Sequence, residues 1–184
     1  GLQKKELKVP GADGRTLISG GADQTLRVWD LPNARPLYEL NGHRRSIAAM
    51  ALSPARSCLA VVGSGLAVWL WEARTGAITG RWPAHERMIT TCAFAPDGQI
   101  LATGGSDQII YLWDVASGRR LRMLEGHSQP VERVAFHPTL PLLASGGLDY
   151  SVRLWNVTTG QQRSVQSLHS SWVSDLAFSP DGRW

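Results

Sequence analysis

Four tryptophans recur at a constant spacing of 42 residues, as Trp29, Trp71, Trp113 and Trp155. Four histidines recur at the same spacing, as His43, His85, His127 and His169. A period near 40 that two residue types share indicates repeated supersecondary units, each stacked on its neighbours. This repeat limits the possible folds more than any other feature of the chain. It also favours binding over catalysis, since repeat scaffolds mostly bind.

The composition is that of a globular protein, with 43% hydrophobic and 18% charged residues in a chain of 184. No apolar run approaches the ~20 residues that a transmembrane helix needs, and the first residues do not resemble a signal peptide. We therefore expect no membrane association and a cytoplasmic location. The two cysteines, Cys58 and Cys92, lie in apolar strand-like runs outside any Cys-x-x-Cys motif, so we expect buried free thiols in a reducing compartment.

The unit that contains Trp113 predicts four short strands, at residues 89–94, 100–104, 109–113 and 119–124. Apolar and β-branched residues dominate these segments, and Pro96-Asp97-Gly98 between the first two is a turn sequence. No segment sustains the 3.6-residue apolar period of a helix. Four antiparallel strands per unit predict one blade of a β-propeller.

The repeat divides the chain into an incomplete propeller. We expect residues 1–12 to be a linker or the tail of a preceding segment, because all three lysines lie there. The propeller portion, residues 13–184, is predicted to contain a partial blade at 13–41, blades at 42–83, 84–125 and 126–167, and the start of another at 168–184. The first unit is expected to lack its opening strand, and the last to hold only a strand at 173–178. The predicted fold is therefore all-β, with about four blades of a larger propeller whose other blades come from the rest of the protein or from another subunit.

Several motifs recur in register with this period. Gly42-His43 and Gly126-His127 open two units, Val28-Trp29-Asp30 ends a third strand, and Ala177-Phe178-Ser179-Pro180-Asp181-Gly182 belongs to the last unit. Together they closely resemble the WD40 repeat, over about residues 13–184. The resemblance implies a β-propeller of usually about seven blades, a protein-interaction platform and no enzymatic activity of the domain itself.

A recurring set of histidine, hydroxyl, aspartate and tryptophan residues accompanies the repeat. The set comprises His85, Thr103, Asp107 and Trp113; His127, Ser145, Asp149 and Trp155; and, in the first unit, Ser19, Asp23 and Trp29. A histidine, a serine and an aspartate could form a catalytic triad. A catalytic site needs one such set beside a cleft, however, whereas this set recurs in successive units. The WD40 resemblance implies instead that each set is a buried hydrogen-bond network that ties an outer loop to the inner strands.

The second unit departs from this pattern. Val61 stands at the position of the hydroxyl residue, and Gly65 stands at that of the aspartate. His43 and Trp71 therefore lack two of their expected partners. A buried polar group without a partner costs about 1–3 kcal/mol, so we expect the second blade to open more easily than the two that follow it.

Partner-binding residues follow from the resemblance, since WD40 proteins often use the residue before the tight-turn aspartate and the start of the innermost strand. By position these are Ala22, Ser64, Ser106 and Leu148, and Ser46, Ala48, Met88, Thr90, Pro130, Glu132, Trp172 and Ser174. Large apolar side chains there are unusual, because a monomer would expose them to water. Trp172 is therefore the first candidate for a binding hot spot; the alternative is that it packs against an adjacent blade.

Two aromatic residues and one histidine lie off the repeated set. Trp69 and Tyr111 stand where other units carry Arg27 and Arg153, and we expect them to pack on the opposite face of their sheets. His137 is predicted to be a turn residue with no evident partner in the sequence.

The sequence predicts no cofactor and no metal site. The histidines lie one unit apart, which is not the spacing of a zinc site. Residues 11–16 are glycine-rich but lack the Gly-Lys-Ser/Thr of a phosphate-binding loop.

The net charge of +4 permits an acidic partner. The arginines are mostly dispersed singly, however, which favours solvated strand edges over a nucleic-acid footprint. The first hypothesis is therefore a non-enzymatic scaffold that binds a protein or peptide on its loop face. The alternatives are a docking module whose basic surface binds an acidic polymer such as tubulin or nucleic acid, and a sensor propeller that regulates a linked signalling ATPase or kinase.

Overall fold

The computed structural model describes residues 7–10, 15–21, 23–40, 45–55 and 57–183, and all regular structure in these ranges is β-strand. The first sheet contains β1 (Leu7–Pro10), β2 (Thr16–Gly20), β3 (Leu26–Asp30) and β4 (Arg35–Leu40). The second contains β5 (Ile47–Leu52), β6 (Cys58–Gly63), β7 (Ala67–Glu72) and β8 (Ile78–Pro83). The third contains β9 (Ile89–Phe94), β10 (Ile100–Gly105), β11 (Ile110–Asp114) and β12 (Arg120–Leu124). The fourth contains β13 (Val131–Phe136), β14 (Leu142–Gly147), β15 (Val152–Asn156) and β16 (Gln162–Gln166).

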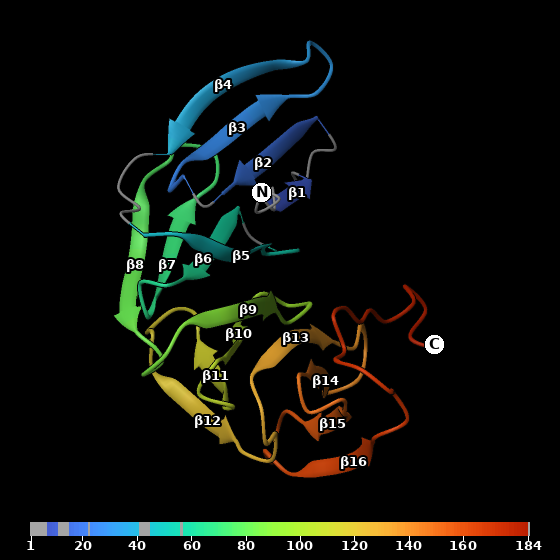
Figure 1. The fold of residues 1–184 in the computed structure, drawn as a ribbon. Helices are drawn as coiled ribbons and strands as arrows, with labels where there is room; N and C mark the ends of the chain where they lie inside the picture. Colours follow the sequence, from blue (N-terminus) through green and yellow to red (C-terminus); the bar gives the residue numbers. More distant parts are fainter. Residues whose placement is uncertain (1–6, 11–14, 22, 41–44, 56, 184) are drawn as a thin grey trace.

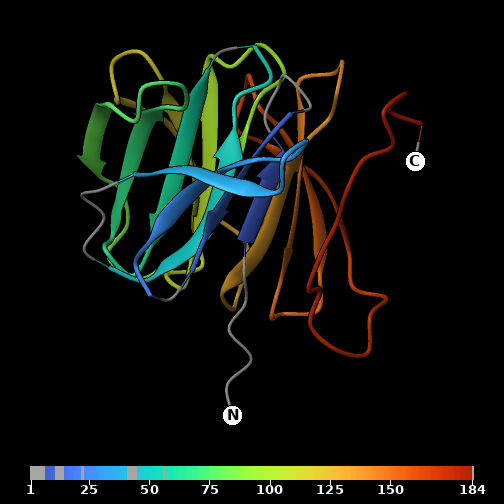
Figure 2. The same ribbon diagram turned by 90° about the horizontal axis from the view of Figure 1, so that it is seen from above.

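The four sheets lie side by side along an open arc (Figure 1). Their first strands, β1, β5, β9 and β13, face the inside of the arc, and their last strands, β4, β8, β12 and β16, form its outer edge. The inner strands are in contact with one another, β5 with β9 and β9 with β13, and Figure 2 shows the same sheets from above. This arrangement confirms the predicted all-β fold of four-stranded propeller blades. Within the described ranges, no helix is long and apolar enough to cross a membrane.

The backbone repeats as closely as the sequence does. The turn between the second and third strands of each sheet holds one residue with a positive φ, at Gln24 (68°), Leu66 (59°), Gln108 (72°) and Tyr150 (63°). Left-handed backbone is uncommon for residues other than glycine, so four such residues at one spacing show that this turn geometry belongs to the unit. Where an aspartate precedes the turn residue, its carboxylate accepts the backbone N–H two positions further on and so stabilises the turn.

Three apolar clusters hold consecutive sheets together. Between the first two sheets, Ile18 and Leu26 lie in one cluster with Leu59 and Trp71; similar clusters join the second sheet to the third and the third to the fourth. Alternate side chains of a strand point to opposite faces, so a sheet between two others is apolar on both faces, and β6, β10 and β14 are buried at nearly every position. Full burial of one leucine or isoleucine side chain stabilises the fold by roughly 1.5–3 kcal/mol.

The first sheet is more complete than the sequence predicted. β1 pairs with β2 along Leu7–Pro10, so the prediction that the first unit lacks its opening strand is wrong. These residues of the predicted linker 1–12 belong to a sheet. The sequence signal was weak because Lys8 and Pro10 interrupt the apolar pattern that marks the other inner strands.

The last predicted strand, at 173–178, is not a strand in the structure. The segment lies against the fourth sheet, where the Val173 N–H donates to the Gly147 carbonyl at 3.1 Å and the Arg133 guanidinium lies 3.1 Å from Asp175. A strand needs paired neighbours along its length, and this segment pairs with no strand along its length among the described residues. The prediction of a strand here is therefore wrong, although the sequence of the segment resembles that of the other inner strands.

Candidate functional site

A hydrogen-bond network runs through the third sheet. His85 Nε2 lies 2.7 Å from Thr103 Oγ1, which accepts the indole N–H of Trp113 at 2.9 Å. His85 Nδ1 lies 2.9 Å from Asp107 Oδ2. A carboxylate only accepts, so the Nδ1 proton donates to Asp107, and the Thr103 hydroxyl proton donates to Nε2. Every buried polar side-chain atom of His85, Thr103 and Trp113 therefore has a partner.

Burial keeps these imidazoles neutral. It lowers the pKa of His85 and of His127 below the ordinary value of 6.5, and this effect outweighs the hydrogen bond and the charge of the neighbouring aspartate, which raise the pKa. The hydroxyl residues of the two networks, Thr103 and Ser145, are fully buried. A substrate cannot reach these hydroxyls, and the same network recurs in two sheets, whereas a catalytic site needs one such set beside a cleft.

The fourth sheet carries the same network with one addition. His127 lies 2.9 Å from Asp149 Oδ2 and 2.7 Å from Ser145 Oγ, which accepts the indole N–H of Trp155 at 2.8 Å. Arg153 adds a guanidinium whose Nη2 lies 3.6 Å from Asp149 Oδ2. An arginine of the same sheet therefore balances the charge of this aspartate.

The first two sheets hold reduced versions of the network. In the first, Ser19 Oγ accepts the indole N–H of Trp29 at 2.8 Å. In the second, Val61 and Trp71 are fully buried, and Trp71 Nε1 has no hydrogen-bond partner among the residues that the structure describes. His43, the predicted histidine of this network, lies outside the described residues.

One end of the sheets carries five of the twelve predicted partner-binding residues, and we call it the loop face. It consists of the segments before the first strands and the turns before the third strands, at residues 84–88, 106–109, 126–130, 148–151 and 167–172. The Ser106 N–H donates to the Met88 carbonyl at 2.8 Å, and the Leu148 N–H donates to the Pro130 carbonyl at 2.9 Å. In the third and fourth sheets, the turn before the third strand is therefore joined to the segment before the first strand.

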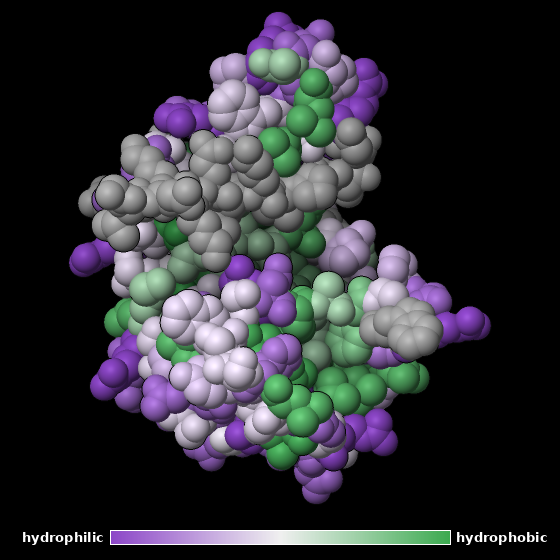
Figure 3. Space-filling model, turned by 45° about the vertical axis from the view of Figure 1, so that its right-hand side comes forward, coloured by the Kyte–Doolittle hydropathy of each residue, from purple (hydrophilic) through white to green (hydrophobic). Residues whose placement is uncertain are grey.

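Large apolar side chains are exposed on the loop face. Trp172 is 62% exposed and Met88 is 43% exposed, and both were predicted from their position in the repeat. Leu168 (87%) and Tyr150 (46%) are exposed there as well. Sequence reasoning missed the last two because they lie outside the motif positions. Apolar surface is interleaved with polar surface on the side of the molecule that carries the fourth sheet and the C-terminal segment (Figure 3).

The other predicted partner-binding residues are less available. The Thr90 hydroxyl lies within hydrogen-bond distance of the Gly104 and Val131 carbonyls, so it joins the third sheet to the fourth. Of the eight others that the structure describes, two are exposed, Ser64 and Ser174. The other six are half-buried: Ser46, Ala48, Ser106, Pro130, Glu132 and Leu148. Ala22 lies outside the described residues.

Trp69 and Tyr111 lie on a different face of their sheets from the one predicted. Trp69 stacks on Trp71 with 6.4 Å between ring centroids, and the Tyr111 ring lies 5.6 Å from that of Trp113. Residues two apart on a strand point to the same face. The predicted packing role therefore agrees with these contacts, whereas the predicted opposite face is wrong.

His137 is a buried turn residue that holds the C-terminal segment against the fourth sheet. Its Nδ1 accepts the backbone N–H groups of Thr139 and Leu140 at 3.1 and 2.9 Å. The ring proton is therefore on Nε2, which donates to the Gly182 carbonyl at 3.0 Å. The sequence showed no partner for His137 because its acceptor lies 45 residues away along the chain.

A family model agrees with this architecture. The model of the WD domain, G-beta repeat, matches residues 10–30, 76–114, 118–156 and 160–184, which is more than half of the chain. The chain belongs to the WD40 family. The match confirms the resemblance drawn from the motifs. Its gap at residues 31–75 contains Val61 and Gly65, so most of the repeat that lacks both the hydroxyl and the aspartate lies outside the matched residues.

Known WD40 proteins resemble parts of the chain. WD repeat and SOCS box-containing protein 1 of Xenopus tropicalis is 44% identical over 57 residues, which are 30% of this chain and 14% of that protein. THO complex subunit 3 of Arabidopsis thaliana is 37% identical over 86 residues, 43% of this chain and 27% of the relative. Small ribosomal subunit protein RACK1y of Oryza sativa subsp. japonica is 33% identical over 67 residues, 36% of this chain and 20% of the relative. The chain therefore matches less than a third of the length of each relative.

Proposed function

We propose that this WD40 chain is a non-enzymatic scaffold that binds a protein or peptide partner on its loop face. The observation that carries the proposal is the exposure there of two large apolar side chains, Trp172 at 62% and Met88 at 43%. Such residues contribute most of the binding energy when a partner buries them. Both lie at the inner edge of the arc, Met88 directly before β9 and Trp172 directly before the segment that contacts β14.

Two further observations support a scaffold. The histidine–hydroxyl–aspartate networks are buried and make the same bonds in two sheets, which is the behaviour of structural groups. The names of two relatives place those proteins in assemblies, a THO complex and the small ribosomal subunit. By similarity to these relatives, we propose that the chain also takes part in a protein assembly.

Affinity capture with the 184-residue chain tests the proposal. We expect proteins that the unmodified chain retains to be lost from Trp172→Ala and Met88→Ala and to be kept by Leu140→Ala. Leu140 is 53% exposed in the connection between β13 and β14, at the opposite end of the sheets, so it controls for exposed apolar surface as such. Circular dichroism of each variant separates loss of binding from loss of fold. Equal retention by all three variants would contradict the proposal.

Charge pairing argues against the alternative of a basic surface for an acidic polymer. Several arginines are already paired with acids of the chain, as in Arg27–Glu39, Arg133–Asp175 and Arg153–Asp149. A partner held by phosphates or other dense negative charge loses affinity steeply between about 50 and 200 mM salt. For the scaffold proposed here we expect a shallow salt dependence, measured on any captured partner.

We also propose a cytoplasmic location. Cys92 is a free cysteine and is buried, which suits a reducing compartment. Microscopy of the full protein carrying a fluorescent tag tests the location, and a secreted or organellar signal would contradict it.

A further inference from the structure

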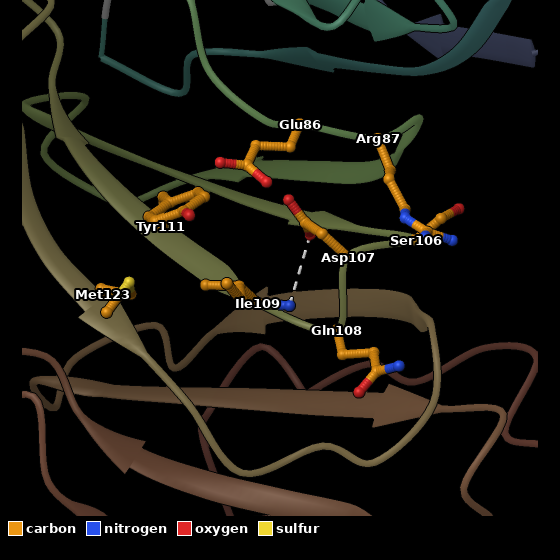
Figure 4. A pocket seen from close by; sticks show the side chains of 8 residues that line it. All are labelled: Glu86, Arg87, Ser106, Asp107, Gln108, Ile109, Tyr111 and Met123. Carbon is orange, nitrogen blue, oxygen red and sulfur yellow. Dashed lines mark hydrogen bonds between the residues drawn. The ribbon is translucent and has the colours of Figure 1, made fainter.

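The third sheet has a cavity at the loop face, with a volume of about 500 Å³. Its walls include Glu86 and Arg87 from the segment before β9, Asp107 from the turn before β11, and Tyr111 and Met123 from the two outer strands. Figure 4 shows the carboxylates of Glu86 and Asp107 pointing toward one another across it. The space is therefore bordered by two acids and an apolar wall.

The fourth sheet places an arginine at the equivalent position. Arg153 is opposite Ser145 in the strand register, as Tyr111 is opposite Thr103 in the third sheet. The guanidinium of Arg153 lies 3.6 Å from Asp149. In the third sheet, Asp107 stands at the position of Asp149, but Tyr111 stands at the position of Arg153. Among the described ion pairs, Asp107 therefore has none with an arginine of its own sheet.

Two arginines lie near this cavity without forming a described ion pair with its acids: Arg87 is part of the lining, and the Arg120 guanidinium lies 5.1 Å from the Tyr111 ring centroid. The Asp107 side chain is only 10% exposed, and its histidine partner His85 is neutral because burial lowers the pKa of the ring. Among the described residues, neither Glu86 nor Asp107 forms an ion pair with an arginine or lysine. The Arg87 guanidinium lies beside Ser106, away from both carboxylates (Figure 4).

We propose that this cavity binds the side chain of an arginine supplied by the protein partner, in the place that Arg153 fills in the fourth sheet. A guanidinium presents several N–H donors in one plane and therefore serves two carboxylates at once. Asp107 keeps a free acceptor position, since a carboxylate offers about four, and its oxygens accept only from His85 Nδ1, at 2.9 and 3.0 Å, and from the Ile109 N–H, at 3.4 Å, among the described residues. The aliphatic stem of the arginine lies against Met123, which is 46% exposed. The inference rests on the proposed function, because the arginine belongs to the docked protein.

Nuclear magnetic resonance of the chain with a capped arginine, N-acetyl-arginine-methylamide, tests the site without any partner protein. Labelling the methionine methyl groups gives three reporters, Met50, Met88 and Met123. We expect saturable shifts of Met123 with the arginine probe, little change at the other two, and no saturable shift with the uncharged citrulline analogue. The methionine reporters therefore distinguish the cavity from the rest of the loop face.

Substitutions in the cavity sharpen the test. Glu86→Gln removes one charged acceptor and should weaken probe binding about tenfold or more, the factor expected for one charge-assisted hydrogen bond. Tyr111→Arg supplies the cation from the chain itself and should abolish binding. Glu39→Gln, on an exposed acid of the first sheet outside the cavity, should leave the affinity within about twofold, because a distant surface acid is screened by water.

Three results would overturn the inference: no shift of Met123, equal binding of citrulline, or undiminished binding by Glu86→Gln. These results leave the proposed function standing if captured partners still depend on Trp172. Conversely, loss of the Trp172 dependence with intact probe binding overturns the proposed function and keeps the arginine site.

Discussion

Trp71 and Val61 are fully buried in the same apolar cluster, and the indole N–H of Trp71 has no acceptor among the described residues. In the third sheet, the corresponding N–H of Trp113 donates to Thr103 Oγ1 at 2.9 Å. Valine and threonine have almost the same shape, and the backbone turns of the two sheets are alike. A methyl group in place of a hydroxyl therefore accounts for the missing bond.

Val61→Thr should raise the free energy of unfolding by about 0.5–1.5 kcal/mol, the net value of one hydrogen bond. The new Oγ1 takes the position from which Thr103 accepts an indole N–H in the third sheet, so the buried donor of Trp71 gains a partner. Urea denaturation followed by tryptophan fluorescence measures the change.

Val62→Thr is the matched control for this substitution. Val62 is also fully buried, but it lies in the cluster between the second and third sheets. Its new hydroxyl meets an apolar surface, and we expect a loss of about 1–3 kcal/mol. Equal destabilisation by the two substitutions would show that an acceptor at residue 61 does not stabilise the buried N–H of Trp71.

The second sheet should open more easily than the third and fourth. Its network lacks the hydroxyl and the aspartate, whereas His85 and His127 each connect a loop to the core of their sheets. Native-state hydrogen exchange should therefore show lower protection for amides of β7 than for those of β11 and β15. The same protection in all three strands would be evidence against the idea.

The sequence was most informative where the same residue types recur at one spacing. The spacing located the residues of the His85 and His127 networks, and the resemblance to the WD40 repeat implied that they are joined by hydrogen bonds. The sequence was least informative at the ends of the repeat. Pro10 interrupts the apolar pattern of β1, so the sequence did not predict that strand. The pattern around Val173 predicted a strand, but no neighbouring strand pairs along that segment among the described residues.

Contacts between units were beyond sequence reasoning. The bond from His137 to Gly182 joins segments far apart in the chain, and no motif pairs these residues. The cavity beside Asp107 also required the structure, because its volume depends on how Tyr111 packs against His85, with ring centroids 4.7 Å apart. The substitution of Tyr111 for an arginine was visible in the sequence, but the space that it leaves was not.

Stability should fall as the pH is lowered from neutral. Burial lowers the pKa of His85 and His127 in the folded chain, whereas unfolding returns them to about 6.5. Between the two pKa values the unfolded state holds more protons, so the free energy of unfolding rises with pH. The stability is present above about pH 6.5 and is lost as the pH falls toward the lowered folded pKa. Urea titrations between about pH 7.5 and pH 5 should show this slope.

His127→Gln identifies the source of that slope. Glutamine does not titrate, so the variant should lose part of the pH dependence whatever its absolute stability. The charged groups around His127 are Asp149 and Arg153, and the pKa of Asp149 lies below its ordinary value, so this carboxylate stays ionised across the range. A variant with the full slope of the unmodified chain would show that other groups cause it.

Gly105→Ala should destabilise the third sheet by disrupting its network. A Cβ at Gly105 would lie 2.6 Å from His85 Nδ1 and 2.7 Å from Asp107 Oδ1, so the methyl group and the hydrogen bond cannot keep their places together. We expect a loss of about 1–3 kcal/mol, the cost of a buried polar group without its partner. Gly65→Ala is the control, because its Cβ would meet only the Arg45 side chain at 3.5 Å, and its effect should stay within about 0.5 kcal/mol. Thermal unfolding of both variants decides the matter: equal melting temperatures would mean that the bond between His85 and Asp107 contributes little to the stability of the sheet.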